Sequence, residues 1–154
     1  MSALPFDVAS LLPHRAPMVL LSEVLEVTPT GARTRTRIGE RTWLFEAHDG
    51  SVSASILIEI MAQSVGIYAG SRAREAGLPP KIGFLLGTRR LTTTVSRLER
   101  GACIDIDVDC VFLSEDGSLP SQFACQAVMN GQEIGCANLT VYQPDDPEHL
   151  PFSD

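Results

Sequence analysis

Positive charge is scarce in this sequence, which carries 12 lysines and arginines against 19 aspartates and glutamates and has a net charge of −7. Nucleic acids and anionic membranes are bound through cationic surfaces, because their own surfaces are densely negative. We therefore expect no nucleic-acid partner and no membrane partner. A local basic patch remains compatible with this charge.

The sequence also lacks the pattern of a signal peptide and the cysteine spacing of a metal site. The N-terminal stretch MSALPFDVAS has no cationic region followed by an apolar run, so we expect no signal peptide and a cytoplasmic location. No two cysteines form a CxxC pair, and the three histidines lie far from the cysteines in the sequence. We expect no metal and no organic cofactor, and we interpret the cysteines as small apolar residues on buried strand faces. These cysteines are Cys103, Cys110, Cys125 and Cys136.

A chain of 154 residues is long enough to bury a sizeable core in one domain. No internal repeat or change of composition divides the sequence, and we expect a single domain over residues 1–154. Residues 144–154 are acidic and interrupted by prolines, so we expect them to form a loosely ordered tail.

The longest apolar stretch runs from Val52 to Gly70 and is rich in isoleucine and alanine, and its alanine, leucine and methionine residues favour helix. Its length approaches that of a membrane span, but its serines, glycines and polar residues predict a core helix instead. Ser51 or Ser53 is a suitable N-cap for this helix. We expect the helix to end at Gly77, just before a pair of prolines.

Alternating residues predict strands on both sides of this helix. Residues 32–38 alternate arginine with threonine, and residues 102–112 alternate aspartate with apolar residues, so each strand has one charged face. Asn130–Gly131 predicts a tight turn between two more strands. We expect an α+β architecture, in which a curved antiparallel sheet of about five or six strands wraps around one long central helix. The other expected strands are 18–27, 81–94, 122–129 and 133–142.

Glu59 is the only charged residue in the apolar stretch. A carboxylate buried without a partner costs several kcal/mol, so it would pair with another group or hold its proton. On a helical wheel Glu59 shares one face with Gln63, Gly66 and Gly70, a polar and small stripe that another backbone or a thin ligand can approach closely. Alternatively, Glu59 emerges at an edge of the core and is solvated or pairs with an arginine.

His48 is the nearest histidine to Glu59 in the sequence and precedes the helix in the loop AHDG. A carboxyl group beside a histidine makes a usable acid–base pair. A single loop histidine is also compatible with an ordinary surface position.

Two segments of the chain resemble a known enzyme family. LLPHRAPMVLLSEVLEV and ILIEIMAQSVGIYAG are similar to the opening and the central helix of the 3-hydroxyacyl-[acyl-carrier-protein] dehydratases, FabZ-type enzymes with the hotdog fold. The later segments LLGTRRL and VYQPD resemble a divergent branch of dehydratase-like proteins found in aryl-polyene and related fatty-acid-like gene clusters. The resemblance extends from about Leu11 to Asp146 and implies a hotdog fold paired as a homodimer or as a heterodimer with a homologue.

The resemblance also implies an activity, the dehydration of a 3-hydroxyacyl thioester on an acyl carrier protein to the trans-2-enoyl thioester, in fatty-acid or polyene-type lipid biosynthesis. Glu59 matches the helix carboxylate of the family, and Gln63 matches the glutamine beside it. His48 matches the catalytic histidine, which in the family acts with the carboxylate of the other subunit. The family's GHFPG-type loop is replaced here by AHDGSVSA, and the spacing from His48 to Glu59 is shorter.

Other residues take supporting roles in this interpretation. Backbone N–H groups at Ala54 and Ser55 would stabilise the enolate oxygen. Leu57, Ile58 and Phe84 are expected to line the acyl tunnel. Arginines near the helix end and on the next strand are expected to dock the acidic carrier protein, namely Arg72, Arg74, Arg89 and Arg90.

Two alternative functions stay open. A hotdog acyl thioesterase would use the helix carboxylate to activate water. A non-catalytic acyl-binding or partner subunit would pair with an active homologue, and the altered AHDGSVSA loop favours this alternative over the first.

Overall fold

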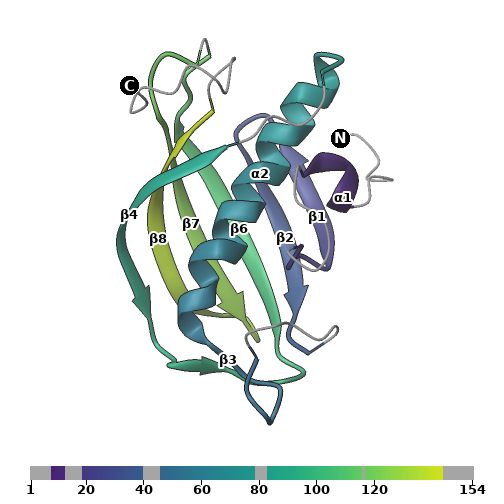
Figure 1. The fold of residues 1–154 in the computed structure, drawn as a ribbon, viewed down its shortest axis with the longest axis vertical. Helices are drawn as coiled ribbons and strands as arrows, with labels where there is room; N and C mark the ends of the chain where they lie inside the picture. The colour runs from purple at the N-terminus through teal and green to yellow at the C-terminus, as the bar shows by residue number, and fades with distance from the viewer. Residues whose placement is uncertain (1–7, 13–18, 40–45, 79–82, 116, 144–154) are drawn as a thin grey trace.

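The structure is a computed structural model that describes residues 8–12, 19–39, 46–78, 83–115 and 117–143. One long helix packs against a curved antiparallel sheet (Figure 1). The helices are α1 (Val8–Leu11), the 3₁₀ turn η1 (Ala54–Ile56) and α2 (Leu57–Glu75). The strands are β1 (Glu23–Thr28), β2 (Gly31–Arg37), β3 (Val52–Ser53), β4 (Phe84–Thr93), β5 (Arg97–Leu98), β6 (Cys103–Phe112), β7 (Ser121–Met129) and β8 (Gln132–Tyr142).

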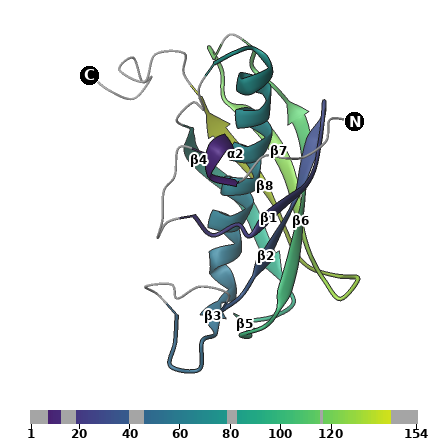
Figure 2. The same cartoon turned by 90° about the vertical axis from the view of Figure 1, so that its right-hand side faces the viewer.

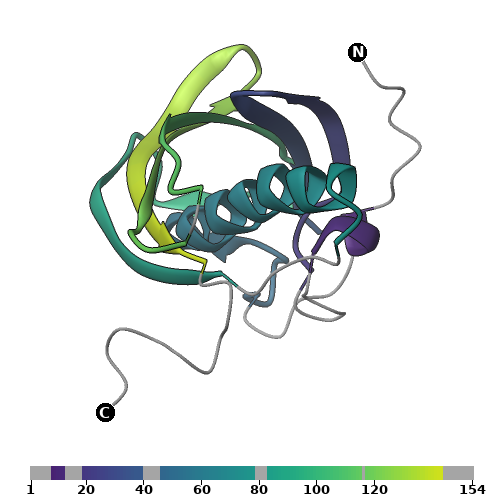
Figure 3. The ribbon, with the colours of Figure 1, turned by 90° about the horizontal axis from the view of Figure 1, so that it is seen from above.

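The main sheet has six strands in the order β1-β2-β6-β7-β8-β4, and β3 and β5 form a second, two-stranded sheet. All the paired strands are antiparallel. Seen from above, the main sheet curves around α2 (Figure 3), and the side view shows α2 along one face of it (Figure 2). The expected fold, a curved antiparallel sheet wrapped around one long helix, is confirmed.

The two charged strand faces predicted from the sequence lie side by side, because β2 pairs with β6. Arg33 and Arg35 of β2 stand opposite Asp107 and Asp105 of β6, and each arginine Nε lies 2.8 Å from a carboxylate oxygen of its partner. The hydrogen bond to Asp107 raises the pKa of Arg33. The outer face of this part of the sheet is therefore a ladder of opposite charges.

The inner face of β2 carries two buried threonines beside Ala32, and one of the threonines bonds to the helix. Thr34 is fully buried, and its hydroxyl lies 2.7 Å from that of Ser64 in α2. The Ser64 hydroxyl donates in turn to the carbonyl of Ile60 at 2.8 Å. A buried hydroxyl without a partner is costly. The hydrogen bonds of this pair avoid that cost and allow two polar side chains to lie between helix and sheet.

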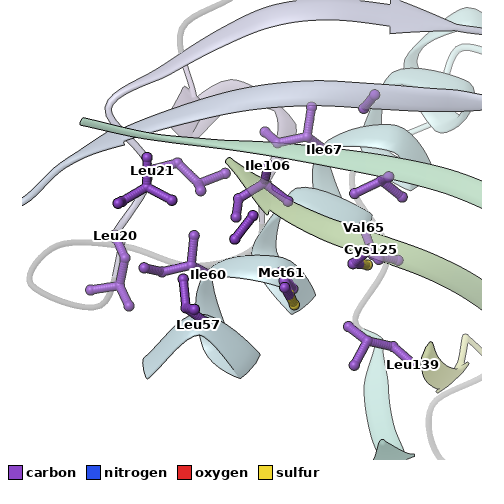
Figure 4. Close-up of a cluster of buried hydrophobic side chains, with 14 of the residues drawn as sticks. Leu20, Leu21, Leu57, Ile60, Met61, Val65, Ile67, Ile106, Cys125 and Leu139 are labelled. Atoms are coloured by element: carbon purple, nitrogen blue, oxygen red, sulfur yellow. The ribbon is translucent and has the colours of Figure 1, made fainter. Parts of the chain in front are cut away.

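The core lies between α2 and the concave face of the sheet (Figure 4). Ile60, Met61 and Ile67 of α2 are completely buried, as are Ile106 of β6 and Leu139 of β8. The alternation in β6 predicted this inward face correctly for Ile104, Ile106 and Val108, but a bulge after Cys110 leaves Phe112 exposed. Together, η1 and α2 form a segment that is as long and as apolar as a membrane span. Of the 18 consecutive residues that are most apolar in this segment, 61% are buried inside the structure, as expected of a core helix.

Both ends of the long helix follow the sequence signals. The Ser53 hydroxyl accepts from the Ser55 N–H at 3.3 Å, so Ser53, one of the two expected caps, is the N-cap of η1. At the other end Gly77 has φ +76°, a conformation that glycine adopts without strain. The N–H of Leu78 donates to the carbonyl of Ala73 at 2.8 Å, which closes the helix in a Schellman arrangement.

The cysteines differ in exposure, and the interpretation of all four as buried residues holds only for Cys125. Cys125 is 1% exposed, and Cys110 and Cys136 are intermediate, but Cys103 at the start of β6 is exposed. Cys103 lies on the same face of β6 as Asp105 and Asp107, which points away from the core, and this explains its exposure. Burial raises the pKa of the Cys125 thiol to about 12.

We expect the difference in exposure between Cys103 and Cys125 to appear in thiol labelling. At pH 8 the folded protein should react with a thiol reagent at Cys103, while Cys125 reacts at least about a thousandfold more slowly, because both its thiolate fraction and its access are reduced. Peptide mass spectrometry after timed labelling measures both rates. Equal rates at the two cysteines in the folded protein would contradict the burial of β7 against α2, and labelling in urea provides the unfolded reference.

Candidate active site

The stripe predicted on α2 is covered by the N-terminal segment of the same chain. A Cβ atom on Gly70 would lie 2.0 Å from the carbonyl oxygen of Leu11, and one on Gly66 would lie 2.8 Å from Cδ2 of Leu12. The expectation that another backbone approaches the stripe is confirmed at Gly70, where the backbone is that of α1, whereas the neighbour of Gly66 is the side chain of Leu12. This short helix was not predicted from the sequence, although its buried residues Val8 and Leu11 are spaced as on one helix face.

Gln63 continues the stripe and is completely buried. Its Oε1 accepts a hydrogen bond from the backbone N–H of Leu20 at 2.9 Å, and its Nε2 donates to Oε1 of Glu59 at 3.0 Å. With both ends of the amide occupied, the side chain is fixed in one orientation. The backbone before β1 thus holds Gln63, and Gln63 holds the carboxylate of Glu59.

Glu59 lies in the first turn of α2, where a carboxylate interacts favourably with the helix dipole. Its side chain is of intermediate exposure, between the buried Gln63 and the surface. The sequence suggested a carboxylate surrounded by apolar residues. The structure instead places it at the edge of the core, as in the alternative interpretation, with the buried amide of Gln63 on one side.

His48 lies in an exposed turn before β3. The turn is built from local bonds, since Ala47 N–H donates to the Ser51 carbonyl and Gly50 N–H to the Ala47 carbonyl, both at 2.9 Å. Asp49 Oδ1 accepts from the Ser51 N–H, and the bonds to Ser51 lower the pKa of Asp49. No hydrogen bond joins His48 to Glu59 within the described residues of one chain.

The two N–H groups expected to stabilise an enolate are already occupied. Ala54 N–H donates to the Ser96 carbonyl at 2.9 Å, which extends the pairing of β3 with β5, and Ser55 N–H donates to the Ser53 hydroxyl. The arrangement speaks against the role that we assigned to Ala54 and Ser55. The physical reason is that the short sheet brings Ser96 beside the start of the helix.

The expected tunnel residues do not lie together on an open surface. Leu57 is completely buried, and its Cδ1 packs toward Gly135 of β8, so it belongs to the core. Ile58 is of intermediate exposure on another side of the helix. Phe84 begins β4, and its side chain lies outside the described part of the structure.

The four arginines proposed to dock a carrier protein fall into two groups. Arg72 contacts Glu115 at 3.3 Å and lies 5.8 Å from the ring centre of Tyr68, and Arg74 contacts the Ser10 hydroxyl at 3.4 Å. Arg89 and Arg90 instead lie in β4 and line a hollow with residues of β7 and β8. The helix-end arginines are thus held by neighbours, and those of β4 form a separate pair.

A curved antiparallel sheet wrapped around one long helix is the hotdog fold that the resemblance implied. The chain belongs to the ApeP-like family, whose model is described as ApeP dehydratase and matches residues 6–151. The resemblance to the aryl-polyene branch of dehydratases is confirmed. A search of curated protein sequences gives no significant match.

Solved structures agree with this assignment. A chain of the dehydratase heterocomplex ApeI:P from Xenorhabdus doucetiae is 28% identical over 93% of this chain and 94% of its own, with a TM-score of 0.85. An HP0420 homologue from Helicobacter felis is 10% identical over 95% of this chain and 94% of its own, with a TM-score of 0.65. A hypothetical thioesterase with coenzyme A from Streptococcus pneumoniae is 12% identical over 80% of this chain and 88% of its own, with a TM-score of 0.58. The last two show the fold alone.

Proposed function

We propose that this chain acts in the dehydration of a 3-hydroxyacyl thioester on an acyl carrier protein to the trans-2-enoyl thioester, in fatty-acid or polyene-type lipid biosynthesis. The observation that carries the proposal is the position of Glu59. It lies in the first turn of α2, partly exposed, and it is oriented by the buried Gln63. Membership of a dehydratase family supports the same reaction.

In the proposed reaction, His48 removes a proton from the carbon next to the thioester carbonyl. Glu59 in its protonated form gives a proton to the 3-hydroxyl group, the carbon–oxygen bond breaks, and water leaves. The electron pair of the broken C–H bond becomes the new double bond between the second and third carbons. As in the family that the sequence resembles, the pair would form between His48 of one subunit and a helix carboxylate of the other.

We also propose that the chain works as a dimer with a homologous subunit or with a second copy of itself. β4 is an edge strand of the main sheet, and its Leu85 and Leu86 are 40% and 44% exposed. An apolar strand edge of this kind is a usual place for pairing with another chain. The similar structure from Xenorhabdus doucetiae is a heterocomplex, which supports a partner that is a homologue.

A second function is favoured by the exposed position of His48. In this alternative the chain is a non-catalytic acyl-binding subunit, which pairs with an active homologue and contributes no catalytic side chain. The exposed turn that holds His48 is built by backbone bonds and does not direct the imidazole to any described residue of the same chain.

A mixing experiment separates the two functions. Enoyl formation from a 3-hydroxyacyl-carrier protein is followed with this chain alone, with a homologous dehydratase subunit alone, and with both. Turnover by this chain alone, or turnover of the mixture that depends on Glu59, supports the dehydratase proposal. Turnover of the mixture that is unchanged by Glu59→Gln supports the non-catalytic subunit.

His48→Ala is expected to lower kcat for dehydration by about 100-fold or more, because the reaction loses its general base. Its stability should be unchanged, since the side chain is exposed and the turn is held by backbone bonds. The measurement is steady-state enoyl formation, with Asp49→Asn in the same turn as a control expected to keep most of the activity. Full activity of His48→Ala would show that the base lies elsewhere.

A further inference from the structure

The turn that carries His48 is closed by Ser51. This serine is 1% exposed, whereas Ala47, His48 and Asp49 are exposed. The Ser51 carbonyl accepts from the Ala47 N–H at 2.9 Å, and the Ser51 N–H donates to Oδ1 of Asp49, also at 2.9 Å. These two bonds join Ser51 to the residues on either side of His48. The orientation of the turn therefore depends on what holds Ser51.

Arg97 of β5 holds Ser51 from outside the turn. Its Nε donates to the Ser51 hydroxyl at 2.8 Å, and its Nη2 donates to the Ser51 carbonyl at 3.1 Å. Two donors of one planar guanidinium thus fix both the side chain and the backbone of this serine. The carbonyl also accepts from Ala47, and its two lone pairs can serve both donors. The arginine is therefore bonded to the same oxygen that closes the turn.

Arg100 packs on the same turn. A Cβ atom on Gly50 would lie 2.9 Å from Cδ of Arg100, and one on Gly39, after β2, would lie 2.6 Å from its Cγ. Both glycines have positive φ, +80° and +84°, and the arginine stem lies against them where other residues would carry a side chain. Arg100 supports the turn by packing, whereas Arg97 forms hydrogen bonds to it.

The strand that carries Arg97 is anchored to the core and to the start of the long helix. In the pairing of β3 with β5, Val52 stands opposite Leu98, and their side chains are 0% and 1% exposed. The Ala54 N–H donates to the Ser96 carbonyl at 2.9 Å. Figure 2 shows β3 and β5 together at the end of the molecule where α2 begins. Arg97 thus connects the His48 turn to a part of the subunit that the core holds in place.

We propose that Arg97 is a positioning residue for His48. It acts through Ser51 and limits the motion of the turn, so that the imidazole reaches the reacting carbon in one geometry. A general base must lie within hydrogen-bond reach of the proton it removes, and a displacement of about 1 Å can cost about a hundredfold in rate. This inference rests on the proposed function for the role of His48. The order of the turn is measured without any turnover.

The first measurement is NMR on the full chain, alone and in complex with a homologous subunit. Arg97→Ala should speed amide exchange at Ala47 and Ser51 by at least about tenfold, because two hydrogen bonds to Ser51 are lost. The ring signal of His48, identified by its absence in His48→Ala, should show greater motion in ¹³C relaxation. The signals of the other two histidines of the chain should not change. Circular dichroism checks that each variant is folded.

The second measurement is steady-state enoyl formation. Arg97→Ala should lower kcat by about 10- to 100-fold, and KM should stay within about threefold, because the arginine does not contact the substrate. Ser51→Ala removes the hydroxyl acceptor alone and should cause a smaller loss. Because both changes break one contact, the double variant should lose less than the product of the two single losses. Arg33→Ala is the matched control, since it removes an exposed arginine of β2 and should change neither exchange at the turn nor kcat.

Arg97→Lys separates position from charge. Lysine keeps the positive charge but lacks the planar pair of donors that bonds the hydroxyl and the carbonyl together. We expect this variant to remain impaired in both measurements. Wild-type kcat in Arg97→Lys would assign the effect to charge and overturn the inference.

Three further outcomes also overturn it. Unchanged amide exchange in Arg97→Ala would show that the turn is ordered without the arginine. Faster exchange with wild-type kcat would make the contact structural only. A lower kcat with unchanged exchange would place Arg97 in contact with the substrate or its carrier. If His48→Ala is fully active, or the wild type gives no turnover, the proposed function fails together with the catalytic role of Arg97, whereas amide exchange still decides whether Arg97 orders the turn.

Discussion

Glu59→Gln is expected to lower kcat for dehydration by about 100- to 10,000-fold, the range for loss of a positioned general acid. The amide has almost the same shape as the carboxyl group, and its oxygen can still accept the hydrogen bond from Gln63. Geometry and stability should therefore change little, while the proton needed by the departing hydroxyl group is lost. Enoyl formation under single-turnover conditions measures the effect, because it isolates the chemical step from product release.

Glu75→Gln is the matched control, since Glu75 is an exposed glutamate in the last turn of the same helix. It changes the net charge by the same amount and should leave dehydration unaffected. If Glu59→Gln is as active as this control, Glu59 is not the acid. If the two variants lose activity equally, the net charge of the helix matters and the position of the carboxyl group does not.

Gly70→Ala is expected to destabilise the protein by about 2 kcal/mol. The new Cβ would lie 2.0 Å from the carbonyl oxygen of Leu11, and a backbone atom cannot move aside as a side chain can. Such overpacking costs about 3 kcal/mol, and the higher helix propensity of alanine returns about 1 kcal/mol. Urea unfolding followed by circular dichroism measures the net free energy.

Gly66→Ala is the comparison, because it makes the same exchange one helical turn earlier and meets only the end of the Leu12 side chain. It should remain within about 1 kcal/mol of the wild type. Hydrogen exchange adds a second measurement, since Gly70→Ala should lower the protection of α1 more than Gly66→Ala does. Equal stability and equal protection in the two variants would contradict the packing of α1 on this face of α2.

The helix and most strands could be predicted because their signals are local. The alternation in β6, the Asn130–Gly131 turn and the helix stop at Gly77 each depend on a few consecutive residues. The turn has φ +54° and +76° at its two residues, as the sequence indicates. Helix α1 could not be predicted in this way, because four residues are too few to establish a helical period. It is stabilised by packing on α2, which depends on the tertiary structure.

The candidate site likewise combines contacts that local spacing predicts with contacts that depend on the tertiary structure. The contact of Glu59 with Gln63 follows from their spacing on a helix, and the family resemblance singled out both residues. The bond from Gln63 to the Leu20 N–H joins residues 43 positions apart, which no local pattern predicts. The occupied N–H of Ala54 likewise depends on the pairing of β3 with β5. The irregularity of β4 between Arg89 and Thr92, where Arg90 has φ +49°, has no sequence signal, because arginine is an unusual residue in the left-handed region.

The most direct test of the account is the mass of a carrier protein loaded with a 3-hydroxyacyl chain, before and after incubation with this chain and a homologous subunit. Intact-protein mass spectrometry reads the outcome without a coupled assay. The account predicts that the acyl-carrier protein loses the mass of one water and keeps its acyl chain, and that Glu59→Gln prevents this loss. Release of the bare carrier would identify a thioesterase, and an unchanged mass with the wild type would contradict the proposed dehydration.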